Sequence, residues 1–266
     1  MLHTLLSALP KSYPYKNQIH IFDTIDSTNT RAKAMGLQGA PHGTALIAKA
    51  QTAGRGRLGR SFHSPQSQGI YLSLVLRPGC HAKSLMHLTC AVGVAVCDAI
   101  DSITGLRPGI KWTNDLVFGK RKLGGILTEL SLSPAGTVDF AVVGIGINCA
   151  QKIEDFPPEI RDIATSITEI TGKEADLAPL AAAVLTSLAA MSDRLLSCRE
   201  DILAQYRKDC VTLGKEISVV TPTSVRHGVA VDIDPEGALV VDFSDGHREA
   251  VNSGEVSIRG MYGYLS

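Results

Sequence analysis

The ten residues Gln51–Arg60 (QTAGRGRLGR) restrict the fold more than any other segment, because they cannot form a regular helix. Three glycines are interleaved with Arg55, Arg57 and Arg60, and each glycine is costly inside a helix and frees the backbone. Thr44–Ala50, which leads into this segment, has the small and β-branched residues of a strand. We therefore predict a loop that hangs from the end of a sheet and wraps round a ligand.

The arginines of this glycine–arginine loop indicate the charge of its ligand. Arginine is a permanently charged, forked donor that suits carboxylate or phosphate, and glycine lets backbone N–H groups come close. The loop therefore favours a small anionic ligand, such as a nucleotide or an acyl phosphate. The Arg55-Gly-Arg57 triplet alone is equally compatible with a solvated basic turn.

Length and charge limit the class of protein. The chain has 266 residues, enough for one large domain and a small one, and its hydrophobic fraction of 44% is ordinary for a globular protein. Its 26 basic and 26 acidic side chains give a formal net charge of zero. A general nucleic-acid binder usually carries a basic excess, so the local group of arginines favours a pocket over a broad charged surface.

The cysteines and the N-terminus predict a cytoplasmic protein. None of the six cysteines belongs to a CxxC pair, which favours reduced thiols over a disulfide framework or a zinc site. The first ten residues lack a basic region, and no uninterrupted run approaches the roughly 18–20 apolar residues of a membrane span.

Hydrophobic periodicity divides the chain into a mixed part and an all-β tail. We predict an α+β fold with a mixed, largely antiparallel sheet flanked by helices, followed by a small SH3-like β-barrel. The expected strands of the first part are residues 20–24, 44–50, 69–77, 109–112, 115–118, 123–132 and 138–148. Its expected helices are residues 31–35, 84–103, 176–196 and 200–210. The expected strands of the tail include residues 217–221, 225–232, 239–243 and 248–251, with a turn at Pro222-Thr223.

Three other segments carry polar groups that suit a binding site, and each has a plain structural alternative. Asp26–Asn29 offers hydroxyl and amide groups to a neutral ligand such as a urea, or simply caps a helix. Lys111–Asp115 (KWTND) places a cation, an aromatic ring and a carboxylate at a hairpin corner, or anchors the hairpin with a buried Trp112. Lys122–Glu129 has a Gly-Gly pair on which a flat ligand can lie, or a β-bulge.

Known nucleotide and catalytic motifs are missing from the sequence. Gly144–Asn148 (GIGIN) lacks the spacing of a dinucleotide fingerprint, and the chain has no P-loop. It also contains no HExxH, GxSxG or CxxC motif. Any nucleotide is therefore held in another way.

In their order along the chain, these motifs resemble those of the biotin protein ligases. The resemblance runs from about residue 20 to the end and implies a class II synthetase-like catalytic domain over residues 1–212 and an SH3-like domain over 213–266. Regulatory members carry a DNA-binding helix-turn-helix domain ahead of the core. Only about twenty residues precede the first expected strand, so we expect the monofunctional type, which does not bind DNA. The matching segments are Asp26–Asn29, Gln51–Arg60 with Ser64-Pro65, Tyr71–Ser73, Lys111–Asp115, Lys122–Glu129, Val143–Asn148 and Asn252–Ile258.

The resemblance implies two half-reactions. Biotin and ATP, with Mg²⁺, give biotinyl-5′-AMP and pyrophosphate, and a lysine of a biotin carboxyl carrier protein then attacks the acyl-adenylate and releases AMP. The implied substrates are biotin and ATP, without a bound prosthetic group or a dedicated metal site. The implied partner is the carrier protein of acetyl-CoA carboxylase or another biotin-dependent carboxylase. No membrane is implied, and a homodimer is compatible with the family.

The resemblance also assigns roles to individual residues. Ser27, Thr28 and Gln51 are expected to bind the ureido ring of biotin. Arg57 and Lys122 are expected to contact carboxylate and phosphate oxygens, and the loop is expected to close over the adenylate and exclude water. The expected catalytic residues are Arg57, Lys111, Asp115 and Lys122, with Asp115 orienting or deprotonating the carrier lysine. The expected substrate-binding residues are Ser27, Thr28, Asn29, Gln51, Gly54, Arg55, Gly56 and Gly125. The expected nucleotide-binding residues are Arg57, Arg60, Phe62, Lys122 and Asn148.

Three positions depart from the family pattern, and two other functions stay open. Phe62 stands where the family often has Trp, Thr113 replaces a usual Pro, and Leu58 stands where another Arg is sometimes found. A lipoate–protein ligase would be expected to carry an RRxSGGG-type loop, which this chain lacks. A non-enzymatic biotin-binding protein would not need all three of Arg57, Lys111 and Lys122, so their presence favours an enzyme.

Overall fold

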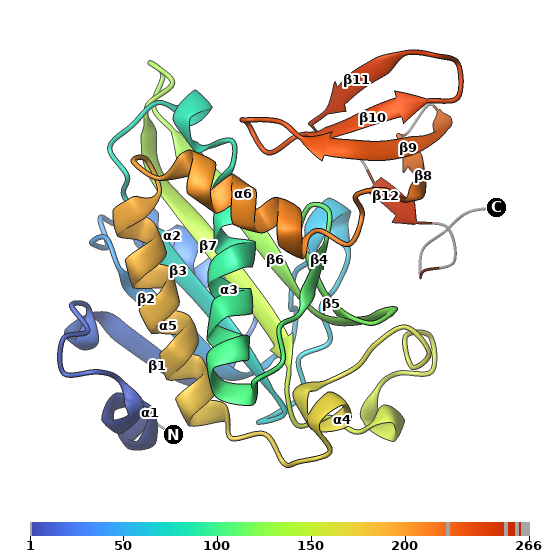
Figure 1. The fold of residues 1–266 in the computed structure, drawn as a ribbon. Coiled ribbons are helices and arrows are strands. Elements are labelled where there is room, and N and C mark those ends of the chain that lie inside the picture. Colours follow the sequence, from blue (N-terminus) through green and yellow to red (C-terminus); the bar gives the residue numbers. More distant parts are fainter. Residues whose placement is uncertain (1, 222–223, 253–254, 259–260, 262–266) are drawn as a thin grey trace.

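The computed structural model describes residues 2–221, 224–252, 255–258 and 261. Pro222-Thr223, an expected turn, and Ser253-Gly254, part of a family-like motif, lie outside the described residues. The chain forms a large sheet covered by helices and a smaller C-terminal sheet, which stands beside one end of the large one (Figure 1).

The large sheet has seven strands in the order β1-β2-β3-β7-β6-β5-β4. Only the β1–β2 pair is parallel, so the prediction of a mixed, largely antiparallel sheet is confirmed. The strands are β1 (Ile19–Ile25), β2 (Thr44–Gln51), β3 (Gly69–Leu76), β4 (Gly109–Lys111), β5 (Asp115–Phe118), β6 (Arg121–Leu132) and β7 (Val138–Asn148).

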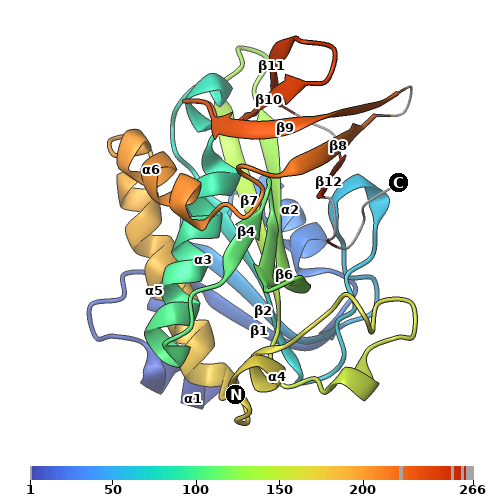
Figure 2. The ribbon, with the colours of Figure 1, turned by 45° about the vertical axis from the view of Figure 1, so that its right-hand side comes forward.

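Helices cover both faces of this sheet (Figure 2). On one face, α3 (Leu88–Thr104) packs against α5 (Leu177–Arg194) and α6 (Arg199–Asp209), and α1 (Leu2–Ala8) packs against α5. On the opposite face, α2 (Thr28–Leu37) contacts β2, β3 and β7. The large core lies on the first side, where β3 is buried along its whole length. A short helix α4 (Ile167–Thr171) follows β7.

The segment Ala82–Thr104 is long and apolar enough to cross a membrane, although most of it is buried inside the protein. It comprises a 3₁₀ turn, Ala82–Leu85, followed by α3. Because α3 contacts β6 of the sheet as well as α5 and α6, an apolar surface on most of its sides is what a core helix requires.

The tail forms a five-stranded antiparallel sheet in the order β11-β10-β9-β8-β12. The small β domain is thus confirmed, and β11 and β12 form the two edges of the described sheet. From α6, the guanidinium of Arg207 donates to the carbonyl of Ile233 at 2.6 Å and joins this sheet to the helical layer. The strands are β8 (Glu216–Val220), β9 (Val225–Ile233), β10 (Leu239–Phe243), β11 (Arg248–Val251) and β12 (Glu255–Ile258).

Three details differ from or sharpen the sequence interpretation. The N-terminal residues form α1, and Leu5 and Leu9 are buried. The expected helix 84–103 begins only at Leu88, after the 3₁₀ turn. All six cysteines are free thiols, as predicted, and burial raises the pKa of Cys90 and Cys149 to about 12.

Candidate active site

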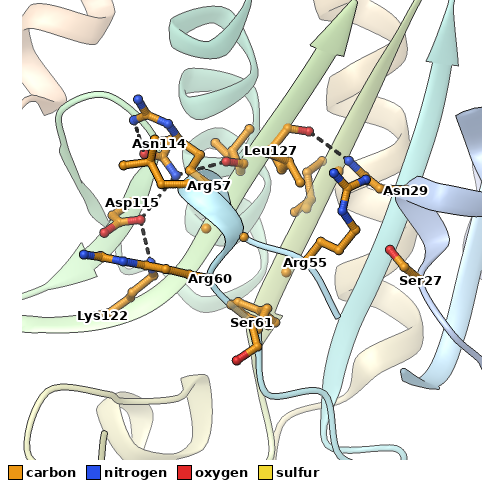
Figure 3. A pocket seen from close by; sticks show the side chains of 18 of the residues that line it. Ser27, Asn29, Arg55, Arg57, Arg60, Ser61, Asn114, Asp115, Lys122 and Leu127 are labelled. Atoms are coloured by element: carbon orange, nitrogen blue, oxygen red, sulfur yellow. Dashed lines mark hydrogen bonds and ion pairs between the residues drawn. The ribbon is translucent and has the colours of Figure 1, made fainter. Parts of the chain in front are cut away.

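A cavity of about 160 Å³ opens where the glycine–arginine loop crosses over β6 and β7 beside the start of α2 (Figure 3). Its lining includes every predicted site residue except Gly54 and Asn148. Residues that are far apart in the chain, such as Ser27 and Gly125, therefore meet at one place. The predicted residues in the lining are Ser27, Thr28, Asn29, Gln51, Arg55, Gly56, Arg57, Arg60, Phe62, Lys111, Asp115, Lys122 and Gly125.

The glycine–arginine loop folds back on itself. The N–H of Gly56 donates to the carbonyl of Arg60 at 2.7 Å, and the N–H of Phe62 donates to the carbonyl of Gly54 at 2.9 Å. A 3₁₀ turn at Arg57–Gly59 forms the tip. A side chain at Gly54 would collide with the carbonyl of Phe62, so this glycine permits the two stems of the loop to approach. The expected contact between Gly54 and biotin stays a prediction.

Hydroxyl and amide groups form one side of the cavity. The N–H of Thr28 donates to Oε1 of Gln51 at 2.8 Å, and the Thr28 hydroxyl donates to the same oxygen at 3.1 Å. Nε2 of Gln51 donates to Oγ of Ser64 at 2.9 Å. Ser27 caps α2 by accepting from the N–H of Thr30 at 3.4 Å. The helix-cap interpretation is thus correct, and the same residues also line the cavity.

Cations form the other side, together with a carboxylate and an amide. Nζ of Lys122 lies 2.6 Å from Oδ1 of Asp115, and Nη1 of Arg57 donates to Oδ1 of Asn114 at 2.8 Å (Figure 3). Lys111 also reaches the cavity although its side chain is almost completely buried. The opposed sides suit a ligand that is neutral and polar at one end and anionic at the other.

An aromatic ring and glycines complete the wall. Phe62 packs so closely on β7 that a Cβ at Gly146 would lie 2.6 Å from its ring. The ring of Tyr71 meets Phe62 edge-on, with centroids 6.4 Å apart. Phe62 therefore offers an aromatic surface at the position where the family often has Trp.

Asn148 lies at the end of β7, and it does not belong to the cavity lining. Its Nδ2 donates to the carbonyl of Thr165 at 3.0 Å. The same segment pairs with the backbone of Lys122, since Lys122 N–H donates to the carbonyl of Ile163 at 2.7 Å. Asn148 thus supports the segment that holds Lys122, and its expected contact with the nucleotide stays a prediction.

The sequence interpretation gave no role to three residues that shape this site. Asn114 holds Arg57 and belongs to the KWTND motif, so the motif itself was the available signal. Glu129 is the last residue of the matching segment Lys122–Glu129, and its Oε2 accepts from Nη1 of Arg55 at 3.0 Å. Val256 brings the C-terminal sheet to the cavity, and the matching segment Asn252–Ile258 that contains it was the available signal.

The described residues include no group of three or more His, Cys, Asp or Glu side chains positioned to hold a metal ion. Asp115 is the acidic side chain of the cavity lining, and it pairs with Lys122.

Comparison with known proteins shows that the chain is similar to biotin and lipoate protein ligases. The profile of the Biotin/lipoate A/B protein ligase family matches residues 21–148, and that of the Biotin protein ligase C terminal domain matches residues 212–259. The chain belongs to the biotin protein ligase family.

Individual relatives agree with this assignment. The chain is 34% identical over 228 residues to the bifunctional ligase/repressor BirA of Bacillus spizizenii, covering 85% of this chain and 70% of the relative. It is 31% identical over 245 residues to the biotin–[acetyl-CoA-carboxylase] ligase of Mycobacterium tuberculosis, covering 90% and 88%. The biotin protein ligase of Aquifex aeolicus, solved with biotin and ATP, superposes with a TM-score of 0.77 at 31% identity, covering 91% of this chain and 98% of that one.

Proposed function

We infer that this protein activates biotin with ATP to form biotinyl-5′-AMP and then transfers biotin to a lysine of a biotin carrier protein. The cavity carries this inference, because it sets a neutral hydrogen-bonding side opposite Arg57 and Lys122 in a chain of the biotin protein ligase family. A structure of similar fold was solved with biotin and ATP.

The first half-reaction must bring two anions together. The biotin carboxylate attacks the α-phosphate of ATP, its oxygen forms the new bond to phosphorus, and pyrophosphate leaves. Fixed cations lower the barrier by stabilising the charge that develops on the phosphate oxygens. We assign this role to Arg57 and Lys122, because both line the cavity and are held by partners, Asn114 and Asp115. Mg²⁺ belongs to this step as the ion that accompanies the ATP phosphates.

The neutral side of the cavity fits the ureido ring of biotin. A urea offers one carbonyl acceptor and two N–H donors, and Ser27, Thr28 and Gln51 present hydroxyl and amide groups of both kinds. We propose that these three side chains bind the ring and that Asn29 supports them. The aromatic surface of Phe62 is proposed to contact the nucleotide, with Arg60 beside it in the loop.

The second half-reaction needs a neutral amine. The lysine nitrogen attacks the acyl carbon, the bond to AMP breaks, and one proton leaves the nitrogen. We propose that Asp115 orients the incoming lysine or accepts its proton, since its carboxylate lies in the cavity wall beside Lys122. Lys111, buried next to this corner, is proposed to add positive charge.

Several finer points belong to the proposal. We propose a catalytic domain of residues 1–212 and a C-terminal domain of 213–266, with Val256 as the contact of the second domain with the cavity. A cytoplasmic location, the absence of DNA and membrane partners, and the homodimer remain predictions. The carrier is proposed to be a biotin carboxyl carrier domain, as the name of the Mycobacterium tuberculosis relative suggests.

Transfer to a carrier tests the proposal. The purified protein is incubated with a biotin carrier domain, Mg-ATP and either biotin or lipoate, and the carrier is weighed by mass spectrometry. We expect the mass of one biotinyl group on a single lysine, only with ATP and only with biotin. A lipoyl mass would favour the lipoate ligases, and an unmodified carrier despite bound biotin would favour a binding protein.

A further inference from the structure

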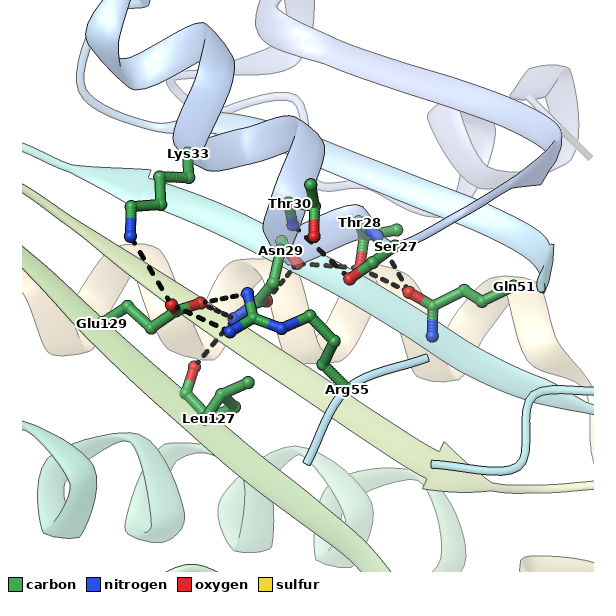
Figure 4. A network of polar contacts seen from close by, with 10 residues as sticks. Ser27, Thr28, Asn29, Thr30, Lys33, Gln51, Arg55, Leu127 and Glu129 are labelled. Atoms are coloured by element: carbon green, nitrogen blue, oxygen red, sulfur yellow. Dashed lines mark hydrogen bonds and ion pairs between the residues drawn. The ribbon is translucent and has the colours of Figure 1, made fainter. Parts of the chain in front are cut away.

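The carboxylate of Glu129 on β6 joins two segments that border the cavity (Figure 4). Arg55 of the glycine–arginine loop donates to it twice, from Nη1 at 3.0 Å and from Nη2 at 3.3 Å. Asn29 of α2 donates from Nδ2 at 3.1 Å, and Nζ of Lys33 lies 3.9 Å away. One carboxylate therefore accepts hydrogen bonds from the loop, through Arg55, and from the start of α2, through Asn29.

The arrangement is more than an isolated surface ion pair. The Glu129 side chain is only 20% exposed, and its two oxygens face the two nitrogens of the Arg55 fork. Paired, partly buried geometry of this kind is stronger than the usual surface pair. Asn29 is fixed in turn, because its Oδ1 accepts from Ser73 at 2.6 Å and its Nδ2 also reaches the carbonyl of Leu127.

The position of this contact bears on how the loop is held. The N–H groups of Thr52 and Ala53 tie the start of the loop to the carbonyls of Ile25 and Asp26, whereas the tip is closed by a bond within the loop, from Gly56 to Arg60. The side-chain contacts that attach the tip of the loop to the sheet across the cavity include Arg57 to Asn114 and Arg55 to Glu129. In the proposed reaction Arg57 is needed by the anionic ligand, whereas the Arg55–Glu129 pair is an attachment that can persist while ligand is bound.

We propose that Glu129 is a positioning residue that, by holding Arg55, keeps the glycine–arginine loop over the acyl-adenylate until the carrier lysine arrives. This inference rests on the proposed function, because it concerns the retention of the intermediate of that reaction. It also assigns the Arg55 side chain to the loop's attachment, which leaves Arg57 and Lys122 to face the anionic groups of the ligand.

The test separates formation of the intermediate from its escape. The enzyme is loaded with labelled biotin and Mg-ATP, pyrophosphate is measured, and the complex is isolated by gel filtration. Excess unlabelled biotin is then added, and the loss of label from the protein gives the escape rate. The proteins compared are the wild type, Glu129→Gln, Arg55→Gln and the double variant, with Glu249→Gln as control. Glu249 pairs with Arg226 at 2.7 Å in the C-terminal sheet, so the control removes an Arg–Glu pair away from the cavity.

We expect the Glu129→Gln enzyme to form the intermediate and to lose it about tenfold faster, the usual scale for a charge-assisted hydrogen bond. Arg55→Gln should accelerate escape to a similar extent. The double variant should resemble either single variant, since both remove the same contact. Glu249→Gln should behave as the wild type.

Two results would overturn the proposal while leaving the reaction intact. Escape from Glu129→Gln at the wild-type rate would show that the contact does not retain the intermediate. Additive effects in the double variant would show that Glu129 acts through Asn29 and not through Arg55. A wild type that releases no pyrophosphate with biotin would instead reject the proposed function, and this inference with it.

Discussion

The indole Nε1–H of Trp112 donates a 3.0 Å hydrogen bond to the backbone carbonyl of Gly237. This bond joins the KWTND corner of the catalytic sheet to the turn between β9 and β10 of the C-terminal sheet. The N–H of Trp112 also donates to the hydroxyl of Thr212 at 2.8 Å. Lys111 and Asp115 flank this corner, so the docking of the C-terminal sheet helps to position two residues of the cavity wall.

Trp112→Phe should therefore lower both the stability of the protein and the rate of adenylate formation. Phenylalanine fills most of the space but cannot donate to the Gly237 carbonyl, which keeps the weak, 3.9 Å contact to Cys90 Sγ. We expect the free energy of unfolding to fall by about 1–3 kcal/mol and pyrophosphate release to slow. Urea unfolding followed by circular dichroism measures the first, because Trp112 is the only tryptophan of the chain and its fluorescence is lost. Unchanged stability would mean that the bond contributes nothing to docking.

Substitution by alanine should have different effects on protein stability at Gly124 and Gly125, two adjacent glycines of β6. A Cβ at Gly124 would collide with the carbonyl of Gly146, and it would lie 3.3 Å from Cα of Ile147. Gly124→Ala should lower the free energy of unfolding by about 1–3 kcal/mol. A Cβ at Gly125 would be in ordinary contact with Lys122 and Asp115, the nearest atom being 3.5 Å away.

Because Gly125 lines the cavity, Gly125→Ala should leave stability within about 0.5 kcal/mol and weaken biotin binding. Urea unfolding and isothermal titration calorimetry make the comparison, with each variant serving as the control for the other. Equal loss of stability in both variants would contradict the described geometry of β6.

Strands of the large sheet were predictable where an apolar run of strand length lies between clear turns, as in β3, whose residues are all buried. Helix α1 was not predictable from the sequence, since seven residues without a capping signal give too little periodicity. The site residues came from motif order, which does not tell where a side chain points. Asn148 thus lies in a predicted strand, while its amide turns to Thr165 and away from the cavity lining. The hydrogen bond from Trp112 to Gly237 forms only when two distant segments dock. Its acceptor is a backbone carbonyl, which every residue has, so no residue type in the sequence indicates it.

Lys122→Gln should slow adenylate formation by about 10²–10³-fold, the typical effect of removing one group that stabilises transition-state charge. Lys120→Gln is the matched control, because Lys120 is exposed in the turn two residues earlier. Single-turnover pyrophosphate release measures both variants. If the control loses as much activity as Lys122→Gln, or if neither loses any, Lys122 does not have the assigned role.

His87 should make the protein less stable in mild acid. Burial lowers the pKa of His87 below its ordinary value of 6.5, and its Nε2 bonds to the carbonyl of Leu195 at 2.9 Å. The unfolded chain then binds a proton more readily than the folded one, so stability falls as the pH drops below 6.5 towards the folded value. Melting temperatures between about pH 7 and pH 5 should therefore fall less in His87→Gln, whose amide can donate to the same carbonyl. An identical pH slope in both proteins would exclude His87 as the cause.

The central claim is that this cavity makes and keeps an acyl-adenylate of biotin. The measurement that tests it most directly is rapid-mixing pyrophosphate release with Mg-ATP and biotin, in the absence of any carrier. We predict a burst close to one equivalent per cavity, followed by slow turnover, and no burst with lipoate. Biotin binding without any pyrophosphate, or a burst with lipoate in place of biotin, would contradict the account.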